Sequence, residues 1–252
     1  MYELQYSKPS SVNDAVDEIK KSSDAKFLAG GMTMIPTLKA RLSSADLLVD
    51  LKGANLSNIS VSSSEVIVGS MTRHCDVASS SDIKGSLPAL AKLAGGIGDH
   101  MVRSCGTIGG SLANNDPAAC YPSAVLALGA TVVTNERSIT ADDFFEGMFE
   151  TALNEDEIIT EIKFPIPEKA SYIKFPNPAS RYAMVGVFMV KKPEGISVAV
   201  TGAGENGVFR CQEIENVLNS NFALEALDNI QISHDNLTSD IHASAAYRAN
   251  LI

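Results

Sequence analysis

The sequence is poor in the residues from which disulfide frameworks and metal clusters are built. Its 252 residues include only four cysteines, Cys75, Cys105, Cys120 and Cys211, and no CxxC pair. Thiols so widely separated predict neither a disulfide scaffold nor a zinc or iron–sulfur site, and we interpret them as structural. The four histidines show no metal-ligand spacing either, so we expect no bound metal.

Positive charge and long apolar runs are scarce as well. Twenty Lys and Arg residues stand against thirty Asp and Glu residues, which gives a formal net charge of −10. Such a surface repels a phosphate backbone, so we expect no nucleic-acid partner. The longest apolar runs, such as 183–190, fall far short of the roughly 20 residues that cross a bilayer. The N-terminus also lacks a signal-peptide pattern. These features predict a cytoplasmic protein without a membrane span.

What the chain does have is apolar periodicity. Hydrophobic residues make up 45% of the sequence, enough for the core of one large domain or two modest ones. Val12, Ala15, Val16 and Ile19 recur at helical spacing after a Ser10 or Ser11 cap. We expect two buried strands, 25–31 and 47–51, with a helix over 32–42 between them. This order is compatible with a small parallel sheet.

The remainder of the chain reads as a mixture of strands and helices. A proline cluster at 165–178 marks a candidate domain boundary, because prolines and irregular composition favour linkers. After it, two apolar strands are joined by the turn 191–195, and the C-terminal segments are mostly helical. The strands expected on composition are 65–72, 130–135, 157–167, 183–192 and 196–204, and a helix is expected within 116–129.

Two glycine-rich segments indicate a ligand. Gly30 and Gly31 stand between a predicted strand and a predicted helix, where unpaired N–H groups can receive an anion. An ordinary strand-to-helix turn explains the same pattern equally well. The stretch CGTIGGSLANNDPAACYP, residues 105–122, adds hydroxyl and amide donors at Thr107, Ser111, Asn114 and Asn115. Two such loops in one chain favour a ligand with two phosphates, such as a pyrophosphate dinucleotide.

Two other patterns are weaker. Residues 202–207 read GAGENG and match the GxGxxG fingerprint, which supports an alternative function as an NAD-dependent dehydrogenase. A Rossmann unit needs a further helix and strand, and the 45 residues that remain contain no β-branched run. We therefore interpret this match as a surface turn. The run His74-Cys75-Asp76 is not interpreted as catalytic, because neighbours in sequence rarely face one another.

Four segments, taken together and in order, resemble a known family. They are AGGMTMIPTLKARL, RSCGTIGGSLANNDPAACYP, FFEGMFETALNEDEIITEIKFP and KFPNPASRYAMVGV. They are similar to the signature segments of the FAD-binding medium subunit of molybdenum hydroxylases of the carbon monoxide dehydrogenase, aldehyde oxidoreductase and xanthine dehydrogenase type. The resemblance extends over residues 1 to about 250.

The resemblance implies an α+β fold in two parts. An FAD-binding domain of the vanillyl-alcohol-oxidase (PCMH) type would occupy 1–167, with a small βαβ part at 1–55 and a larger α+β part at 56–167. A small C-terminal α+β domain with an antiparallel sheet would occupy 172–252. The FAD pyrophosphate is expected between two loops, whose residues are Ala29, Gly30, Gly31, Met32 and Thr33, and Thr107, Ile108, Gly109, Gly110 and Ser111.

Further cofactor contacts follow from the same resemblance. Tyr182 is expected near the isoalloxazine ring, with Ile159 and Lys174 close to the flavin. The family usually reads DPAADYP where this chain reads DPAACYP, so Cys120 stands where a carboxylate is expected to bind the sugar-alcohol region. We expect Asn114 or Asp116 to compensate for its loss.

The function implied by the resemblance is electron transfer. Electrons from a molybdopterin-binding large subunit would cross [2Fe-2S] clusters on a small subunit and reach FAD here, in a dimer of heterotrimers. Four scattered cysteines cannot hold even one such cluster. A stand-alone flavin oxidase of the same fold and a non-enzymatic scaffold remain alternatives. The sequence indicates neither the substrate of the complex nor the electron acceptor.

Overall fold

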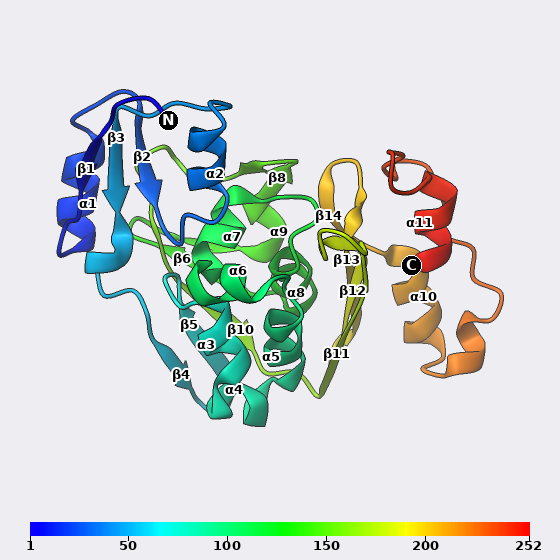
Figure 1. Cartoon of the computed structure of the whole chain (residues 1–252). Helices are drawn as coiled ribbons and strands as arrows, with labels where there is room; N and C mark the ends of the chain where they lie inside the picture. The colour runs from blue at the N-terminus through cyan, green and yellow to red at the C-terminus, as the bar shows by residue number, and fades with distance from the viewer.

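The computed structural model describes all 252 residues, and its N-terminal part is a small parallel sheet flanked by two helices (Figure 1). The strand order is β1-β3-β2. The Ser11 hydroxyl caps α1 by accepting from the Asp14 N–H at 3.1 Å, as predicted. Strand β1 was not predicted, because its three mostly exposed residues show no apolar alternation. The elements are β1 (Gln5–Ser7), α1 (Val12–Ile19), β2 (Ala25–Leu28), α2 (Met34–Lys39), β3 (Leu47–Asp50) and the 3₁₀ turn η1 (Leu51–Gly53).

The middle of the chain forms a five-stranded antiparallel sheet with helices packed against it. The strand order is β4-β5-β10-β6-β7. These strands are β4 (Ile59–Val61), β5 (Glu65–Gly69), β6 (Thr131–Thr134), β7 (Ser138–Thr140) and β10 (Ile159–Pro165). The helices are α3 (His74–Ser79), α4 (Ser81–Ser86), α5 (Pro88–Gly95), α6 (His100–Cys105), α7 (Ile108–Asn114), α8 (Tyr121–Leu128) and α9 (Ala141–Phe144). A short hairpin of β8 (Phe145–Gly147) and β9 (Glu150–Thr151) follows α9.

The stretch 105–122 is therefore not a loop. Most of it is helix α7 and the start of α8, which begins at Tyr121 and ends in a left-handed Gly129. Thr107 caps α7 with its side chain, and Gly109 fits only because it lacks a side chain. A Cβ added there would lie 2.5 Å from the Cβ of Ser70. Close helix-to-strand packing thus explains this glycine.

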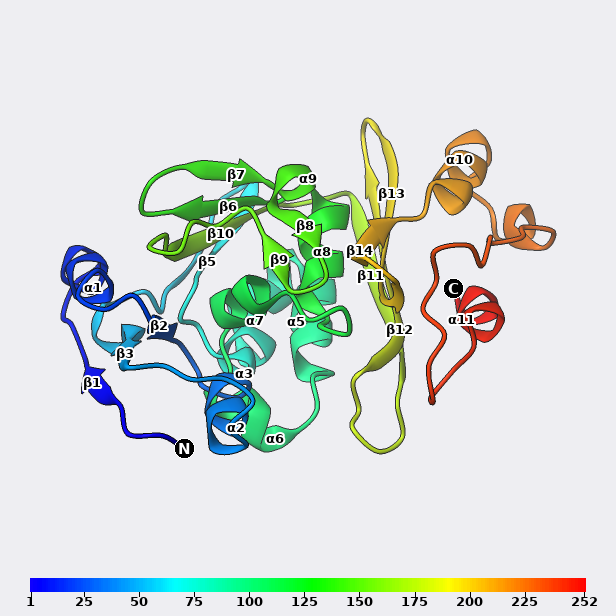
Figure 2. The same ribbon diagram turned by 90° about the horizontal axis from the view of Figure 1, so that it is seen from above.

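The C-terminal part is an antiparallel sheet with helices on both faces (Figures 1 and 2). Its strands are β11 (Lys169–Pro176), β12 (Ala183–Lys192), β13 (Gly195–Gly204) and β14 (Gly207–Arg210), hydrogen-bonded in that order. Helix α8 covers one face and contacts β12 and β13. The other face carries α10 (Gln212–Ser220) and α11 (Ala245–Leu251), with the 3₁₀ turn η2 (Leu224–Leu227) between them in sequence.

One hydrophobic core continues from the middle sheet into the C-terminal sheet. Tyr172 of β11 and Phe188 of β12 belong to the same buried cluster as Ala124 and Leu128 of α8. All eight residues of α8 are buried, which explains its lack of a polar face. Strand β11 begins at Lys169, inside the proline cluster, so the division of the chain at 167–172 stays a prediction. No helix is both long and apolar enough to cross a membrane.

Candidate cofactor-binding site

A cavity of about 360 Å³ lies where the three parts of the chain meet. This volume falls in the ordinary range for small-molecule and cofactor pockets. Of the cofactor-contact residues that the sequence singled out, the cavity collects all except Ile108 and Asn115, which are buried. Those that line it are Ala29, Gly30, Gly31, Met32, Thr33, Thr107, Gly109, Gly110, Ser111, Asn114, Asp116, Cys120, Ile159, Lys174 and Tyr182.

The first glycine segment, residues 29–33, offers free main-chain donors. The N–H groups of Gly30 through Thr33 have no acceptor within the protein. Gly31 has a φ of 73°, a left-handed backbone conformation that glycine adopts without strain and that occurs in the turns whose successive N–H groups bind anions. A Cβ on Gly30 would lie 2.3 Å from the carbonyl oxygen of Cys105, so the segment is held against the end of α6. This wall of the cavity suits a phosphate.

The second glycine segment, residues 107–111, uses its main-chain donors internally. The N–H groups of Ile108, Gly109 and Gly110 donate to Thr72 O (3.1 Å), Ser70 O (2.8 Å) and Thr107 Oγ1 (3.1 Å). These three amides are therefore not available to a ligand. What it offers the cavity are side chains, the Ser111 hydroxyl and the Asn114 amide, which make no hydrogen bond within the protein.

Asn115, also considered as a donor, lies away from the cavity. Its side-chain amide donates to the carbonyl oxygens of Gly147 (2.8 Å) and Glu150 (2.9 Å), and its φ of 40° ends α7. Only 1% of this residue is exposed. Asn115 thus fixes the β8–β9 hairpin beside α7.

Lys174 organises the end of the cavity near Tyr182. Its ammonium donates to the carbonyl oxygens of Gly96 and Arg181, and it lies 3.7 Å from the Cys120 sulfur. One side chain therefore joins the end of α5, the start of α8 and the β11–β12 loop. Tyr182, which follows on this loop, is 51% exposed. Burial, with the charge of Asp116 nearby, raises the pKa of its hydroxyl.

Two residues that line the cavity, Ser70 and His74, were not predicted from the sequence as part of the site. Both line the cavity, and neither Ser70 Oγ nor His74 Nδ1 has a hydrogen-bond partner. Burial, with the positive charge of Arg103, lowers the pKa of His74 to about 4, so the imidazole is neutral at pH 7. Asp76 pairs with Arg73 (2.7 Å) and not with His74. No spacing pattern in the sequence marks these positions.

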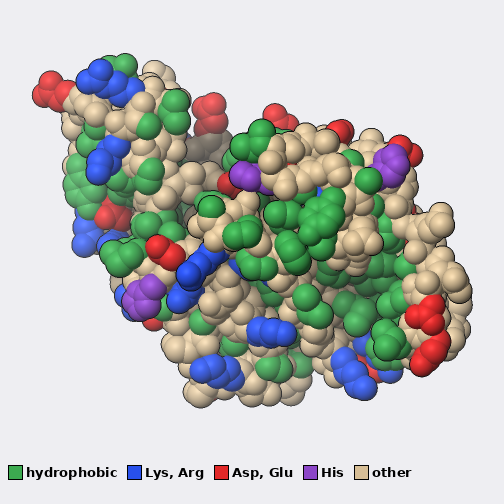
Figure 3. Space-filling view, turned by 45° about the vertical axis from the view of Figure 1, so that its right-hand side comes forward, with side chains coloured by type: hydrophobic (Ala, Val, Ile, Leu, Met, Phe, Trp, Pro, Cys, Tyr) green, Lys and Arg blue, Asp and Glu red, His purple; other side chains and the backbone are tan.

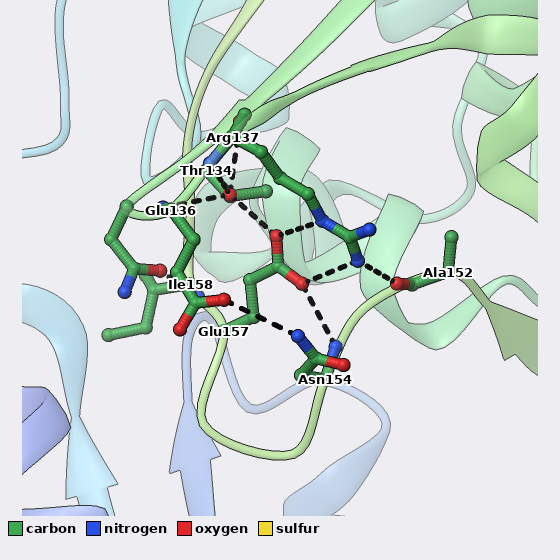
Figure 4. Close-up of polar contacts among 8 residues, drawn as sticks. Thr134, Glu136, Arg137, Ala152, Asn154, Glu157 and Ile158 are labelled. Atoms are coloured by element: carbon green, nitrogen blue, oxygen red, sulfur yellow. Dashed lines mark hydrogen bonds and ion pairs between the residues drawn. The ribbon is translucent and has the colours of Figure 1, made fainter.

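A buried carboxylate supports the wall that contains Ile159. The Glu157 side chain is fully buried and accepts from Thr134 Oγ1 (2.7 Å), Arg137 Nε (3.0 Å) and the Asn154 N–H (3.0 Å) (Figure 4). Burial raises the pKa of Glu157, but these hydrogen bonds and the charge of Arg137 outweigh burial and lower it to about 2. The ion pair of Glu157 and Arg137 fixes the backbone that leads into β10.

The GxGxxG match lies elsewhere. Residues 202–207 form the end of β13, an exposed two-residue turn and the start of β14, and none of them lines the cavity. The fingerprint requires a strand followed by a helix, whereas this segment is a hairpin.

Basic and acidic side chains are interspersed in small groups on the face of the molecule in Figure 3.

The residues present fit a dinucleotide such as FAD. Free amides at 30–33 suit a diphosphate, and Ser111, Asn114 and Asp116 supply polar partners for a sugar-alcohol chain. Ile97, Ile159 and Tyr182 provide apolar and aromatic surface. Unpartnered polar atoms at Ser70 and His74 are the kind of group that a bound ligand satisfies. Fold and site together define an α+β dinucleotide-binding protein.

Residues 2–167 match the family described as the FAD binding domain in molybdopterin dehydrogenase, and the chain belongs to this family. Its cofactor is FAD, and it is an oxidoreductase subunit, the FAD-carrying medium subunit of a molybdenum hydroxylase. The recognition of the family, the cofactor and the α+β fold from the sequence are thus confirmed.

Similar proteins cover nearly the full length of the chain. The glyceraldehyde dehydrogenase medium chain of Sulfolobus acidocaldarius is 32% identical, over 99% of this chain and 94% of the relative. The nicotine 6-hydroxylase medium subunit of Paenarthrobacter nicotinovorans is 32% identical, over 99% and 93%. Among solved structures, a carbon monoxide dehydrogenase from Hydrogenophaga pseudoflava superposes with a TM-score of 0.88 at 31% identity, over 99% and 93%.

Proposed function

We propose that this chain carries electrons through FAD, receiving them from [2Fe-2S] clusters of a small partner subunit and passing them to an external acceptor. The partners would be that small subunit and a large molybdopterin-binding subunit, assembled as a dimer of heterotrimers. Relatives named medium chain or medium subunit support such an assembly. The observation that carries the proposal is that residues 30–33, whose N–H groups have no acceptor within the protein, line a cavity of cofactor size.

The chain's own residues would bind and orient the cofactor. The amides of 30–33 would hold the diphosphate, while Ser111, Asn114 and Asp116 would bind the polyhydroxyl chain. Tyr182 and Ile159 would contact the ring system. FAD, when bound, supplies the ability to accept electrons singly or in pairs. The half-exposed Tyr182 places this end of the cavity near the surface, where an electron donor or acceptor can approach.

Proteins similar to this chain carry names for different substrates, including glyceraldehyde, nicotine and carbon monoxide. We infer that the substrate is determined by the large subunit, and that this chain serves the electron-transfer step alone. An isolated chain reconstituted with FAD would then bind flavin without turning over an aldehyde or an N-heterocycle. Such turnover by the isolated chain would favour a stand-alone flavin oxidase instead.

A titration of FAD into the purified chain tests the proposal. We expect quenching of flavin fluorescence on binding, and weaker binding by Gly30→Ala, whose Cβ would meet the Cys105 carbonyl and displace the free amides. We expect a loss of about tenfold, the order of one well-placed charge-assisted hydrogen bond. Gly85→Ala is the matched control, since no atom lies within 4 Å of its added Cβ.

Two results would contradict the proposal. If the folded wild-type chain fails to bind FAD at any concentration, the proposed role as a carrier of the cofactor is wrong. A chain that binds FAD but does not oxidise the reduced small subunit loses the electron-transfer role. Melting temperatures of both glycine variants separate a local effect on binding from a general loss of the fold.

A further inference from the structure

Cys120 lies in an unusual setting for a structural thiol. It is 6% exposed, lines the cavity and precedes the first turn of α8. The Lys174 ammonium lies 3.7 Å from its sulfur. The Tyr172 hydroxyl, on a side chain that is 3% exposed, lies beside Cys120 and has no hydrogen-bond partner. A buried hydroxyl without an acceptor indicates that a polar atom is missing at this place.

The other three cysteines lack this combination. Cys211 is fully buried outside the cavity, burial raises its pKa to about 11, and its thiol donates to Glu213. Cys75 lies beside Asp76, with 3.6 Å between sulfur and carboxylate oxygen, and Cys105 is exposed. Only Cys120 has two hydrogen-bond donors, Lys174 and Tyr172, next to its sulfur inside a cavity that small molecules can enter.

We propose that Cys120 is a site of reversible oxidation by hydrogen peroxide to a sulfenic acid. The sulfur attacks one peroxide oxygen, the O–O bond breaks and an S–O bond forms. Thiol and hydrogen peroxide give sulfenic acid and water, so sulfur loses two electrons and peroxide gains them. The new oxygen accepts hydrogen bonds from the Lys174 ammonium and the Tyr172 hydroxyl. This oxygen supplies the acceptor that Tyr172 lacks.

Oxidation would also change the cavity. Lys174 holds the carbonyl oxygens of Gly96 and Arg181, and an oxygen on Cys120 would draw the ammonium away from them. The loop that carries Tyr182 would loosen, and the added oxygen would occupy space in the cavity. We expect bound FAD to shield Cys120, and this shielding rests on the function proposed above. The oxidation itself does not depend on FAD.

The experiment treats the full chain with hydrogen peroxide and traps sulfenic acid with dimedone. Peptide mass spectrometry then gives the labelled fraction at each cysteine, with Cys211 as an internal control for a buried thiol. We expect Cys120 in the cofactor-free chain to be labelled at least about fivefold more than Cys211, because the cavity admits the oxidant. Addition of saturating FAD should lower the labelling of Cys120 by a similar factor.

Two variants test the role of the neighbours. Tyr172→Phe removes a hydroxyl that has no partner, so the fold should persist, and Lys174→Met removes the ammonium. Each should lower the labelling of Cys120 and leave that of Cys105 unchanged. Labelling of Cys120 no greater than that of Cys211, or labelling unchanged in Tyr172→Phe and in a folded Lys174→Met, would overturn the proposal. If the chain binds no FAD, the function proposed above fails, while these labelling ratios still decide the oxidation.

Discussion

The two glycine segments of this protein have similar composition and opposite roles. In 30–33 the main-chain N–H groups have no acceptor within the protein and the residues line the cavity, whereas the N–H groups of 108–111 are hydrogen-bonded to Thr72, Ser70 and Thr107. Gly109 permits close contact with Ser70, and Gly31 permits a positive φ. A glycine-rich segment near a ligand can therefore serve the ligand or serve the packing of the wall behind it.

The largest effect on this comparison of the two segments is expected from a substitution of Gly109. We expect Gly109→Ala to lower the free energy of unfolding by about 3 kcal/mol, because its Cβ would overlap Ser70 in a fully packed region. Urea unfolding followed by circular dichroism measures this loss. Gly85→Ala, in open space, is the control. A Gly109 variant as stable as the control would mean that this segment is not fixed by packing.

A second test of the packing around the second glycine segment concerns the pH dependence of stability that His74 produces. Its N–H donates to Gly106 O (3.0 Å), and its folded pKa of about 4 lies below the ordinary value of 6.5. As pH falls, the His74 imidazole is therefore protonated in the unfolded chain before it is protonated in the folded chain. The free energy of unfolding should fall by about 2 kcal/mol as pH drops from 6.5 to 4. The free energy of unfolding, measured by urea at a series of pH values, checks this. His74→Gln should flatten that part of the profile, and an unchanged slope would contradict it.

The smallest effect concerns the two threonines that precede the helices. Thr107 Oγ1 accepts from the Gly110 N–H and caps α7, whereas Thr33 makes no side-chain cap at α2. We expect Thr107→Val to lower the melting midpoint, at a cost of about 1 kcal/mol, and Thr33→Val to leave the stability of the cofactor-free chain nearly unchanged. Equal losses in the two variants would remove the distinction between a free segment and a bonded one.

Much of the fold followed from local pattern. The amphipathic spacing of Val12, Ala15 and Ile19 predicted α1, and the apolar runs predicted β3, β5, β6, β10, β12 and β13. Strand β1 was missed because its pairing with β3 comes from tertiary contact and not from its own composition. Helix α7 was missed because glycines and polar residues are poor helix formers, and its stability comes from the Thr107 cap and from packing on Ser70.

The site was predicted in part. Motif resemblance located the two glycine segments, Cys120, Lys174 and Tyr182, all of which line the cavity. It did not locate Ser70 or His74, whose positions matter only once β5 and α3 pack beneath α7. The Lys174–Cys120 contact joins residues 54 positions apart and leaves no trace in local sequence.

The sequence by itself determined the periodic elements, the family and the cofactor, because each rests on residue types at short, fixed spacing. Only the tertiary structure decided which main-chain amides remain free, since a hydrogen-bond donor is committed or available according to the strand or helix that lies against it. Long-range packing likewise placed Cys120 between Lys174 and Tyr172, from α8 and β11, in one wall of the cavity.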